Sequence, residues 1–527
     1  MRMKQRMKRL NCQFSSLVSS WTAGSCTQAA LAAVVTLVLA AMLPLGTRAA
    51  EQIASPPNES SCAAALHFTT PQRWVGDVHP YYEDGRYHLI YVYDPGDWRV
   101  GHLQSRDLLH WEEREMTHTP PPLVPQVLPN YYVLQIIPDS IHGGYRTFYP
   151  YYGIRVSRSR DLVAWQYAEP QLAVPTPPGY GRMADPYPFW NEDRKEFWMV
   201  VTLRKDGLPL DRAGAFGYAT SADLEHWTWR GELYSPGNIG EPELPLMFKM
   251  GQRWYLLGFP NDGRTLGEPT YRMSSRCDGP WTVPVPDKLD GKHFCPGRTA
   301  FDGTRRLLFG WIPKSILPSG AQHWGGHLAL PRELYALPDG RLAVRLETSV
   351  ADRIRGERLF PKPGSELTPQ AGQWTIVGES AALHRSRQRN SIRLQHAPDR
   401  IDLTLNVTLQ DGCDRAGIVL GSTANSSGYE IAIDKQNNRL AVLNRDGTVC
   451  VMQVIDDLSG RKIQLRVLVD GDIVEVFCAD RYALAARLSE SVRSESVALF
   501  AQGPAEFEEI GVYRLRTLHD IAPAAPK

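Results

Sequence analysis

The sequence predicts an all-β protein, with a five-bladed β-propeller over residues 70–345 followed by a C-terminal antiparallel β-sandwich over residues 367–517. Two phrases that recur about every 55 residues predict the propeller. After Leu367, stretches such as Ile401–Leu409 and Lys462–Asp470 alternate apolar and polar residues, which is typical of half-buried strands in a sandwich.

Residues 1–49 differ from the rest of the chain. A basic start is followed by an apolar run from Ala29 to Leu43 and by the small residues around Ala49. This order predicts a secretory signal peptide cleaved after Ala49, followed by a linker over residues 50–69. We expect a secreted or periplasmic protein with no membrane span after signal removal, because the run is short for a span; a retained signal anchor is the alternative.

Charge and composition narrow the class of protein. The chain has 58 basic and 57 acidic residues, and the signal carries six of the basic ones, so the mature chain has 52 against 57 and a net charge of −5. A mildly acidic surface argues against a nucleic-acid partner. The six remaining cysteines lie far apart without a Cys-x-x-Cys pair, and no phosphate-binding or nucleotide motif occurs. We predict no metal and no cofactor, and the oligomeric state stays open.

The recurring phrases define the blades. The first phrase, Ser-x-Asp-Leu-x-x-Trp, occurs at Ser105–Trp111, Ser159–Trp165 and Ser221–Trp227, with a degraded copy at Ser274–Trp281. The second is an aromatic or β-branched strand after a turn, with copies marked by Tyr87, Tyr145, Phe197, Trp254 and Arg306. A unit of this length with several short strands is typical of one propeller blade, so five copies predict five blades. We expect the repeated residues themselves to pack the scaffold.

Three carboxylates occur at nearly the same distance before the marker strands. Asp77 lies ten residues before Tyr87, Asp185 twelve before Phe197 and Glu243 eleven before Trp254. The innermost strands of a propeller converge on one funnel, where three like charges repel one another. Such a cluster serves proton transfer, nucleophilic attack on a sugar or metal binding. We predict these three residues to be catalytic; the structural alternative is that the aspartates cap turns.

Longer motifs resemble glycoside hydrolase family 32, which includes invertases, inulinases and levanases. The resemblance begins at Trp74–Pro95 and continues through ADPYPFW at Ala184–Trp190, ELPLMF at Glu243–Phe248 and ALPREL at Ala329–Leu334. GYEIAID at Gly428–Asp434 and VDGDIVEVF at Val469–Phe477 resemble the trailing sandwich of the family. The resemblance implies a divergent β-fructofuranosidase-like glycosidase that acts on a carbohydrate by a retaining mechanism.

The same resemblance assigns roles to the three acids. Asp77 matches the family's nucleophile, Asp185 its transition-state stabiliser and Glu243 its general acid/base. The chain departs from the family at Gly76, Val92 and Ala184, where Asn, Gln and Arg stand in the motifs. We therefore expect a poor invertase, and the sugar stays open.

Five neighbouring residues are predicted to bind substrate. They are the aromatic residues Trp74 and Trp98, together with His79, Arg182 and Glu241. A structural role is the alternative for the two tryptophans and the histidine, and Glu241, two residues before Glu243 on the same strand face, is alternatively the true acid or a modulator. Two other functions stay open: an inverting hydrolase of the arabinosidase type, and a sugar-binding propeller without turnover. Residues 346–366 are expected to form a linker and residues 518–527 a tail, of which Ala522–Lys527 is expected to be frayed.

Overall fold

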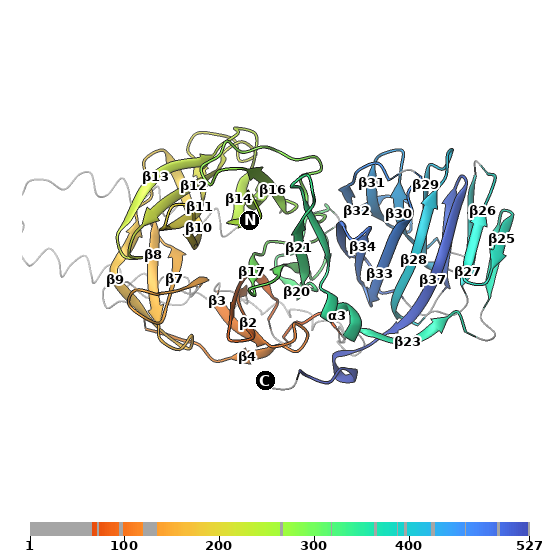
Figure 1. Cartoon of the computed structure of the whole chain (residues 1–527), viewed down its shortest axis with the longest axis horizontal. Helices are drawn as coiled ribbons and strands as arrows, with labels where there is room; N and C mark the ends of the chain where they lie inside the picture. The colour runs from red at the N-terminus through yellow and green to blue at the C-terminus, as the bar shows by residue number, and fades with distance from the viewer. Residues whose placement is uncertain are drawn as a thin grey trace, which may run out of the picture. The chain divides into compact units, whose positions relative to one another are not determined.

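The structure is a computed structural model that describes residues 66–70, 73–93, 99–119, 134–263, 267–317, 319–362, 366–386, 388–394, 398–422, 427–458, 460–492 and 496–524. Within these ranges it is built almost wholly of strands. The strands form a five-bladed β-propeller and a β-sandwich, which confirms the predicted fold class (Figure 1).

Each of the five blades is an antiparallel sheet whose first strand lies nearest the propeller axis. Blade two also carries a short parallel strand, and blade four has three strands. The blade strands are, in order, β1 (Gly76–Glu83), β2 (Arg86–Tyr93), β3 (Arg99–Ser105) and β4 (Glu112–Arg114); β5 (Thr117–Thr119), β6 (Gln135–Pro138), β7 (Tyr145–Pro150), β8 (Ile154–Ser159) and β9 (Ala164–Val174); β10 (Tyr180–Asn191), β11 (Glu196–Lys205), β12 (Gly214–Ser221) and β13 (Trp227–Tyr234); β14 (Glu241–Met250), β15 (Arg253–Asn261) and β16 (Thr270–Ser274); β17 (Thr299–Phe301), β18 (Arg306–Leu308), β21 (Arg332–Ala336) and β22 (Leu342–Leu346).

The Ser-x-Asp-Leu-x-x-Trp phrase forms the same turn after the third strand of the first three blades. In blade three, Ser221 Oγ accepts from the backbone N–H of Leu224, and Asp223 Oδ1 accepts from the N–H of His226. The leucine takes a left-handed conformation in all three copies, with φ of 66° at Leu108, 63° at Leu162 and 64° at Leu224. The side-chain hydrogen bonds offset this backbone strain, so the repeat is a scaffold element, as expected.

Blade five is interrupted by a hairpin made of β19 (Trp311–Pro313) and β20 (Gly326–Leu328). The backbone of Trp311 pairs with that of Cys295, and Gly326 pairs with Val75 next to β1. The sandwich supports the hairpin, because Arg487 donates from Nε to the Pro313 carbonyl at 2.7 Å and contacts His327 Nδ1 at 2.8 Å. The hairpin therefore has a fixed place beside the start of β1.

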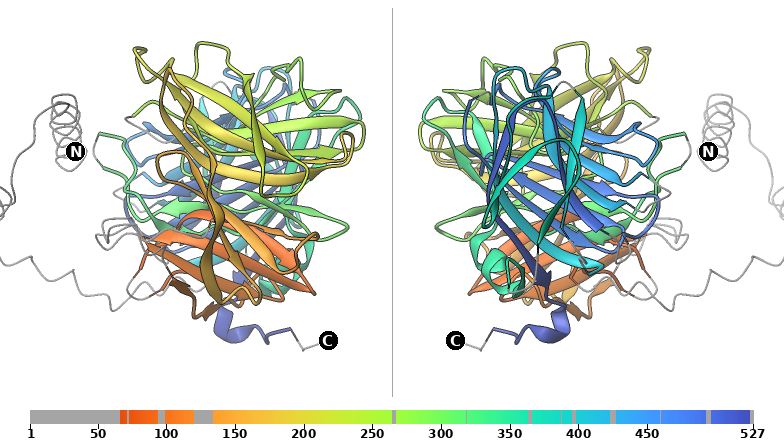
Figure 2. Two further views of the ribbon diagram at one scale, coloured as in Figure 1. Left: turned by 90° about the vertical axis from the view of Figure 1, so that its left-hand side faces the viewer. Right: turned by 90° about the vertical axis from the view of Figure 1, so that its right-hand side faces the viewer.

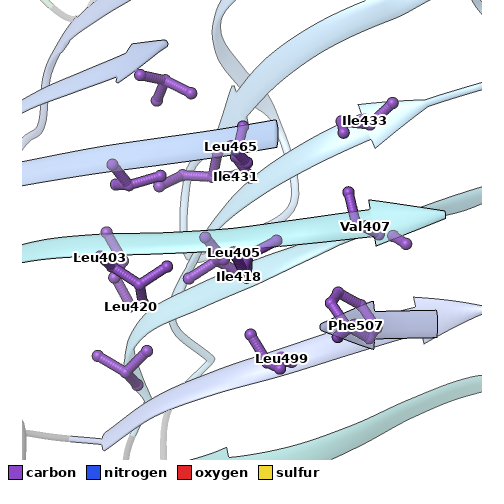
Figure 3. Close-up of a cluster of buried hydrophobic side chains, with 14 of the residues drawn as sticks. Leu403, Leu405, Val407, Ile418, Leu420, Ile431, Ile433, Leu465, Leu499 and Phe507 are labelled. Carbon is purple, nitrogen blue, oxygen red and sulfur yellow. The ribbon is translucent and has the colours of Figure 1, made fainter. Parts of the chain in front are cut away.

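The sandwich consists of an eight-stranded and a seven-stranded sheet, whose apolar faces form one core. Figure 3 shows leucine, isoleucine, valine and phenylalanine side chains of both sheets in contact, and Figure 2 shows the sandwich strands in cyan and blue. The first sheet contains β23 (Arg355–Phe360), β25 (Trp374–Val377), β26 (Ser380–Leu383), β28 (Arg400–Leu409), β33 (Ile463–Asp470), β34 (Ile473–Cys478), β35 (Tyr482–Arg487) and β37 (Ala505–Leu515); the second contains β24 (Leu367–Ala371), β27 (Arg389–Leu394), β29 (Arg415–Ser422), β30 (Tyr429–Asp434), β31 (Arg439–Leu443), β32 (Val449–Val454) and β36 (Ser496–Gln502).

The segments after the propeller and after the sandwich contain ordered elements. The predicted linker over residues 346–366 contains helix α3 (Thr348–Arg353) and β23, which pairs with β37 of the sandwich. The predicted tail begins with the 3-10 helix η1 (Leu518–Asp520), and Ala524 N donates to Asp107 Oδ2 in blade one at 3.1 Å. Both segments are fixed by pairing with distant residues, which their own composition does not reveal.

Buried charges join the propeller, the sandwich and the segment before blade one. His67 lies between two sandwich carboxylates, with 2.9 Å to Asp470 and 2.8 Å to Glu475. Glu475 also pairs with Arg332 of blade five, which binds Asp290 at 3.0 Å. Burial alone would lower the pKa of His67, but the two carboxylates outweigh it and raise the pKa to about 9.

Two further findings concern the described residues. The five cysteines there, Cys277, Cys295, Cys413, Cys450 and Cys478, are free. No helix in the same part of the chain is long and apolar enough to cross a membrane.

Candidate active site

The three predicted catalytic acids lie at irregularities near the start of three innermost strands. The pairing register shifts between Gly76 and His79 in β1, between Ala184 and Tyr187 in β10, and between Glu243 and Leu246 in β14. Such bulges bend a strand and turn a side chain away from the regular alternation. The same local irregularity thus recurs in blades one, three and four.

Backbone conformation shows how the bulges differ. Asp77 and Asp185 have positive φ angles of 40° and 51°, whereas in blade four the positive φ of 45° falls on Leu244, one residue after Glu243. A positive φ at a residue other than glycine costs on the order of 1–3 kcal/mol and is found preferentially at functional sites. In blade four the acid thus stands one residue before the positive-φ position, whereas in blades one and three the aspartate itself occupies that position.

The Asp77 carboxylate lies in a buried, strongly electrostatic environment. Burial raises its pKa well above the usual value, and the charges of Glu243 and Asp185 raise it further. The indole N–H of Trp311 and the Arg182 cation act in the opposite direction and favour the ionised form. Among the described residues Asp77 Oδ1 is a buried oxygen without a hydrogen-bond partner.

Asp185 is fixed from blades three and four. Its Oδ2 accepts from Thr202 Oγ1 at 3.2 Å and faces the backbone N–H of Leu244 at 3.4 Å. Thr202 also donates to the Pro242 carbonyl at 2.6 Å, which ties β11 to β14. This arrangement orients one carboxylate oxygen and leaves Asp185 within electrostatic reach of both Asp77 and Glu243.

Glu243 has the properties of a group that exchanges a proton near neutral pH. Burial raises its pKa to about 7 and Asp185 adds to this effect, whereas Arg182 and a 2.6 Å hydrogen bond from Asn261 Nδ2 lower it. A general acid/base works best with a pKa near the operating pH. The pKa of the neighbouring Asp77 is raised too, because burial and the charges of Glu243 and Asp185 disfavour its ionised form.

Arg182 and Glu241 form an ion pair beside the acids. Arg182 Nη1 lies 2.6 Å from Glu241 Oε1 and 4.0 Å from Glu243 Oε1, and Arg204 approaches the other oxygen of Glu241 at 3.7 Å. Glu241 is 6% exposed, whereas the Arg182 side chain keeps 37% of its surface exposed. Arg182 is therefore placed to contact substrate, and Glu241 to hold Arg182.

The Trp324 indole packs at Gly76 and Val92, the positions where the motifs of family 32 have the amide side chains Asn and Gln. Gly76 and Val92 are cross-strand partners, and Trp324 packs against the cluster that contains Val92. A methyl group built at Gly76 would lie 2.5 Å from the Trp324 ring, so the indole covers this glycine directly. The surface formed by Gly76, Val92 and Trp324 is therefore apolar in this chain, whereas the motifs of family 32 have Asn and Gln at the first two positions.

The structure places the other predicted binding residues differently from one another. Trp74 is 38% exposed, and its ring lies 5.5 Å from His327 with Lys314 Nζ at 5.7 Å. His79 is 2% exposed and contacts Arg298, so its predicted substrate contact does not fit a position beneath the funnel. Trp98 lies outside the described residues.

Sequence reasoning missed four residues that shape the site: Asn261, Arg298, Trp311 and Trp324. Three of them belong to blade five and its hairpin, where the repeated phrases are weakest. In blade five, Cys295 stands eleven residues before the marker Arg306, which is about the offset at which blades one, three and four carry their acids. Among the described residues, no group of three or more histidine, cysteine, aspartate or glutamate side chains is arranged to hold a metal ion.

Comparisons with known proteins agree with this architecture. Residues 67–123 match the glycosyl hydrolases family 32 N-terminal domain, and residues 370–514 match the glycosyl hydrolases family 32 C-terminal domain. The chain is 25% identical to sucrose-6-phosphate hydrolase of Escherichia coli, across 83% of this chain and 91% of that protein. It is 22% identical to the levanbiose-producing levanase of Bacillus subtilis, across 87% and 92%.

Solved structures show the same fold. Exo-inulinase from Aspergillus awamori superimposes with a TM-score of 0.65 at 17% identity, covering 86% of this chain and 98% of the inulinase. Fructan 1-exohydrolase IIa from Cichorium intybus gives a TM-score of 0.63 at 16% identity, with 86% and 98% covered.

The propeller with its three interacting carboxylates, the sandwich and the similarity to these hydrolases indicate a glycosidase that hydrolyses O-glycosyl bonds. Both domain models of glycoside hydrolase family 32 match the chain, in the order of its propeller and its sandwich.

Proposed function

We propose that this glycosidase hydrolyses fructosides or closely related furanosides through a covalent glycosyl-enzyme. The observation that carries the proposal is the coupled cluster of Asp77, Asp185 and Glu243, in which burial brings the pKa of Glu243 to about 7. The names of the relatives, which include a sucrose-6-phosphate hydrolase and a levanase, support a fructoside substrate.

Each residue has one task in the mechanism. Asp77 attacks the anomeric carbon while Glu243 donates its proton to the leaving oxygen, so the glycosidic bond breaks as the Asp77 ester forms. Glu243, now ionised, takes a proton from water, and the hydroxide released attacks the anomeric carbon to free Asp77. Asp185 stabilises the positive charge that develops on the sugar in both steps. Trp311 favours the ionised Asp77 needed for attack.

The wall formed by Gly76, Val92 and Trp324 bears on specificity. Asn and Gln would present hydrogen-bonding groups to sugar hydroxyls, but here an indole covers Gly76 and packs near Val92. Losing one such hydrogen bond costs on the order of 0.5–1.5 kcal/mol. With Ala184 in place of an arginine as well, we propose that sucrose is a poor substrate and that a sugar with an apolar face toward Trp324 is preferred.

We also propose that the enzyme acts outside the cytoplasm, with residues 1–49 as its signal. The support is the order of basic, apolar and small residues in the sequence. N-terminal sequencing of protein secreted by an expression host tests this proposal: a mature chain beginning near Ala50 supports it, and an intact Met1 contradicts it.

Hydrolysis of a substrate panel tests the proposed activity. Sucrose, inulin, levan, arabinan and aryl furanosides are assayed with the wild type and with Asp77→Asn as the matched control. We expect release of sugar by the wild type alone, with the configuration of the first product, followed by NMR before mutarotation, the same as that of the substrate. Inversion would support the arabinosidase-type alternative. Tight glycan binding without turnover would support a sugar-binding propeller.

A further inference from the structure

A buried arginine lies beneath the three acids and joins four blades. Arg298 precedes β17 in blade five and is 0% exposed. Its guanidinium donates to the Asp185 carbonyl at 2.5 Å and to the Pro186 carbonyl at 2.9 Å, both in β10 of blade three. It also contacts His79 Nδ1 of blade one at 3.1 Å and Gln135 Oε1 of blade two at 3.4 Å. No other part of the described site connects as many blades.

The two carbonyl contacts fall on the bulge that presents Asp185. Asp185 has a φ of 51°, and the register of β10 shifts between Ala184 and Tyr187. A strained backbone persists only where its surroundings hold it in place. The planar fork of Arg298 holds two successive carbonyl oxygens of this bulge, which fixes the orientation of the Asp185 peptide. Because Asp185 is within electrostatic reach of Asp77 and Glu243, this backbone sets one corner of the cluster.

The charge of Arg298 is the second part of the argument. Burial lowers its pKa to about 10, with Asp185 and Asp77 opposing the shift, so the guanidinium stays protonated at neutral pH. A guanidinium can only donate hydrogen bonds, so His79 Nδ1 must accept, and Arg298 lowers the pKa of His79 well below its usual value. Arg298 is therefore a permanent positive charge next to a neutral His79.

We propose that Arg298 is a positioning residue for hydrolysis, whose planar fork fixes the bulge that presents Asp185 beside the other two acids. This inference rests on the proposed function. It concerns a residue that does not touch substrate, because the side chain is completely buried below the acids.

Variants separate the fork from the charge. Arg298→Met removes both, so kcat should fall by about tenfold or more. The acid limb of the kcat/KM profile, which reports ionisation of Asp77, should move up by about 0.5–1 pH unit while the basic limb stays in place. Arg298→Lys keeps the charge without the fork, so the acid limb should stay near that of the wild type while kcat falls.

A matched control tests for general damage. Arg306→Met removes a half-buried arginine of the same blade, which stacks over Phe248 at 4.2 Å and donates to Thr299 Oγ1. It should lower the melting temperature without moving either limb. Wild-type limbs and kcat in folded Arg298→Met would overturn the proposal. If that variant does not fold, an unchanged kcat in Arg298→Lys would overturn the positioning role of the fork.

A titration independent of activity separates this proposal from the proposed function. Carboxyl ¹³C resonances of Asp-labelled protein are followed against pH, with Asp77→Asn to assign the Asp77 signal. We expect Asp77 to titrate at a higher pH in Arg298→Met than in the wild type, and equal titration would overturn the charge effect. Lack of hydrolysis by the wild type would count against the proposed function alone.

Discussion

Arg182 lies 2.6 Å from Glu241 and 4.0 Å from Glu243, so one cation serves two carboxylates that stand on the same strand. Arg182 lowers the pKa of Glu243, and Glu241 raises it. The two partners therefore shift the pKa of Glu243 in opposite directions. Removing Arg182 should raise this pKa, and removing Glu241 should lower it.

Glu241→Gln should move the basic limb of the kcat/KM profile to lower pH, by about 0.5–1 unit. The reason is that loss of the negative charge lowers the pKa of Glu243, which must be protonated to act as an acid. A pH–rate profile measures this shift. An upward shift, or loss of the basic limb in this variant but not in Glu243→Gln, would transfer the acid role to Glu241.

Arg182→Met should move both limbs to higher pH, because Arg182 lowers the pKa of Asp77 and of Glu243. Arg182→Lys keeps the charge and should leave both limbs close to the wild type, while KM rises because the planar fork is lost. If the pH–rate profiles of the two variants are the same, the charge of Arg182 does not set the limbs, and only the geometry of its side chain matters.

Gly76→Asn alone should not improve sucrose turnover and should lower the melting temperature, because the new side chain meets the Trp324 ring. Combined with Trp324→Ala, which opens the space, the asparagine should raise kcat/KM for sucrose by about tenfold relative to Trp324→Ala alone. Steady-state kinetics on the three variants measures this gain. An improvement in the single Gly76→Asn variant would contradict the placement of the indole.

The junction that contains His67 predicts how stability depends on pH. The folded pKa of His67 is about 9, above its value of about 6.5 in the unfolded chain. The protonated form therefore contributes stability that is complete below about pH 6.5 and is lost as pH rises through 9, on the order of 3 kcal/mol in all. Melting temperatures between pH 6 and 10 should fall in the wild type and change less in His67→Gln. Parallel curves would contradict the ion-pair account.

The sequence could predict the blades and the three acids because both follow the repeat. Asp77, Asp185 and Glu243 stand at matched offsets, and each lies at a bulge of an innermost strand. Arg298, Trp311 and Trp324 could not be found in this way, since blade five breaks the repeat with the β19–β20 hairpin. The matched offsets also did not reveal a difference in blade four, where the positive φ falls on Leu244 instead of Glu243.

Order in the connecting segments was equally hidden. α3, β23 and η1 depend on partners far along the chain, such as β37 and Asp107. His79 seemed to be a substrate contact because it stands beside Asp77, but the bulge turns the chain between them and leaves His79 on Arg298.

Mass spectrometry of a trapped intermediate tests the central claim, that Asp77 attacks the sugar and Glu243 exchanges the proton. Glu243→Gln is incubated with an activated aryl fructofuranoside, whose leaving group needs no acid, so the first step proceeds and the second is slow. We predict an intact mass increased by one fructosyl unit, located on the peptide that contains Asp77, and no increase in Asp77→Asn/Glu243→Gln. Steady turnover without an adduct, or an adduct on another residue, would contradict the account.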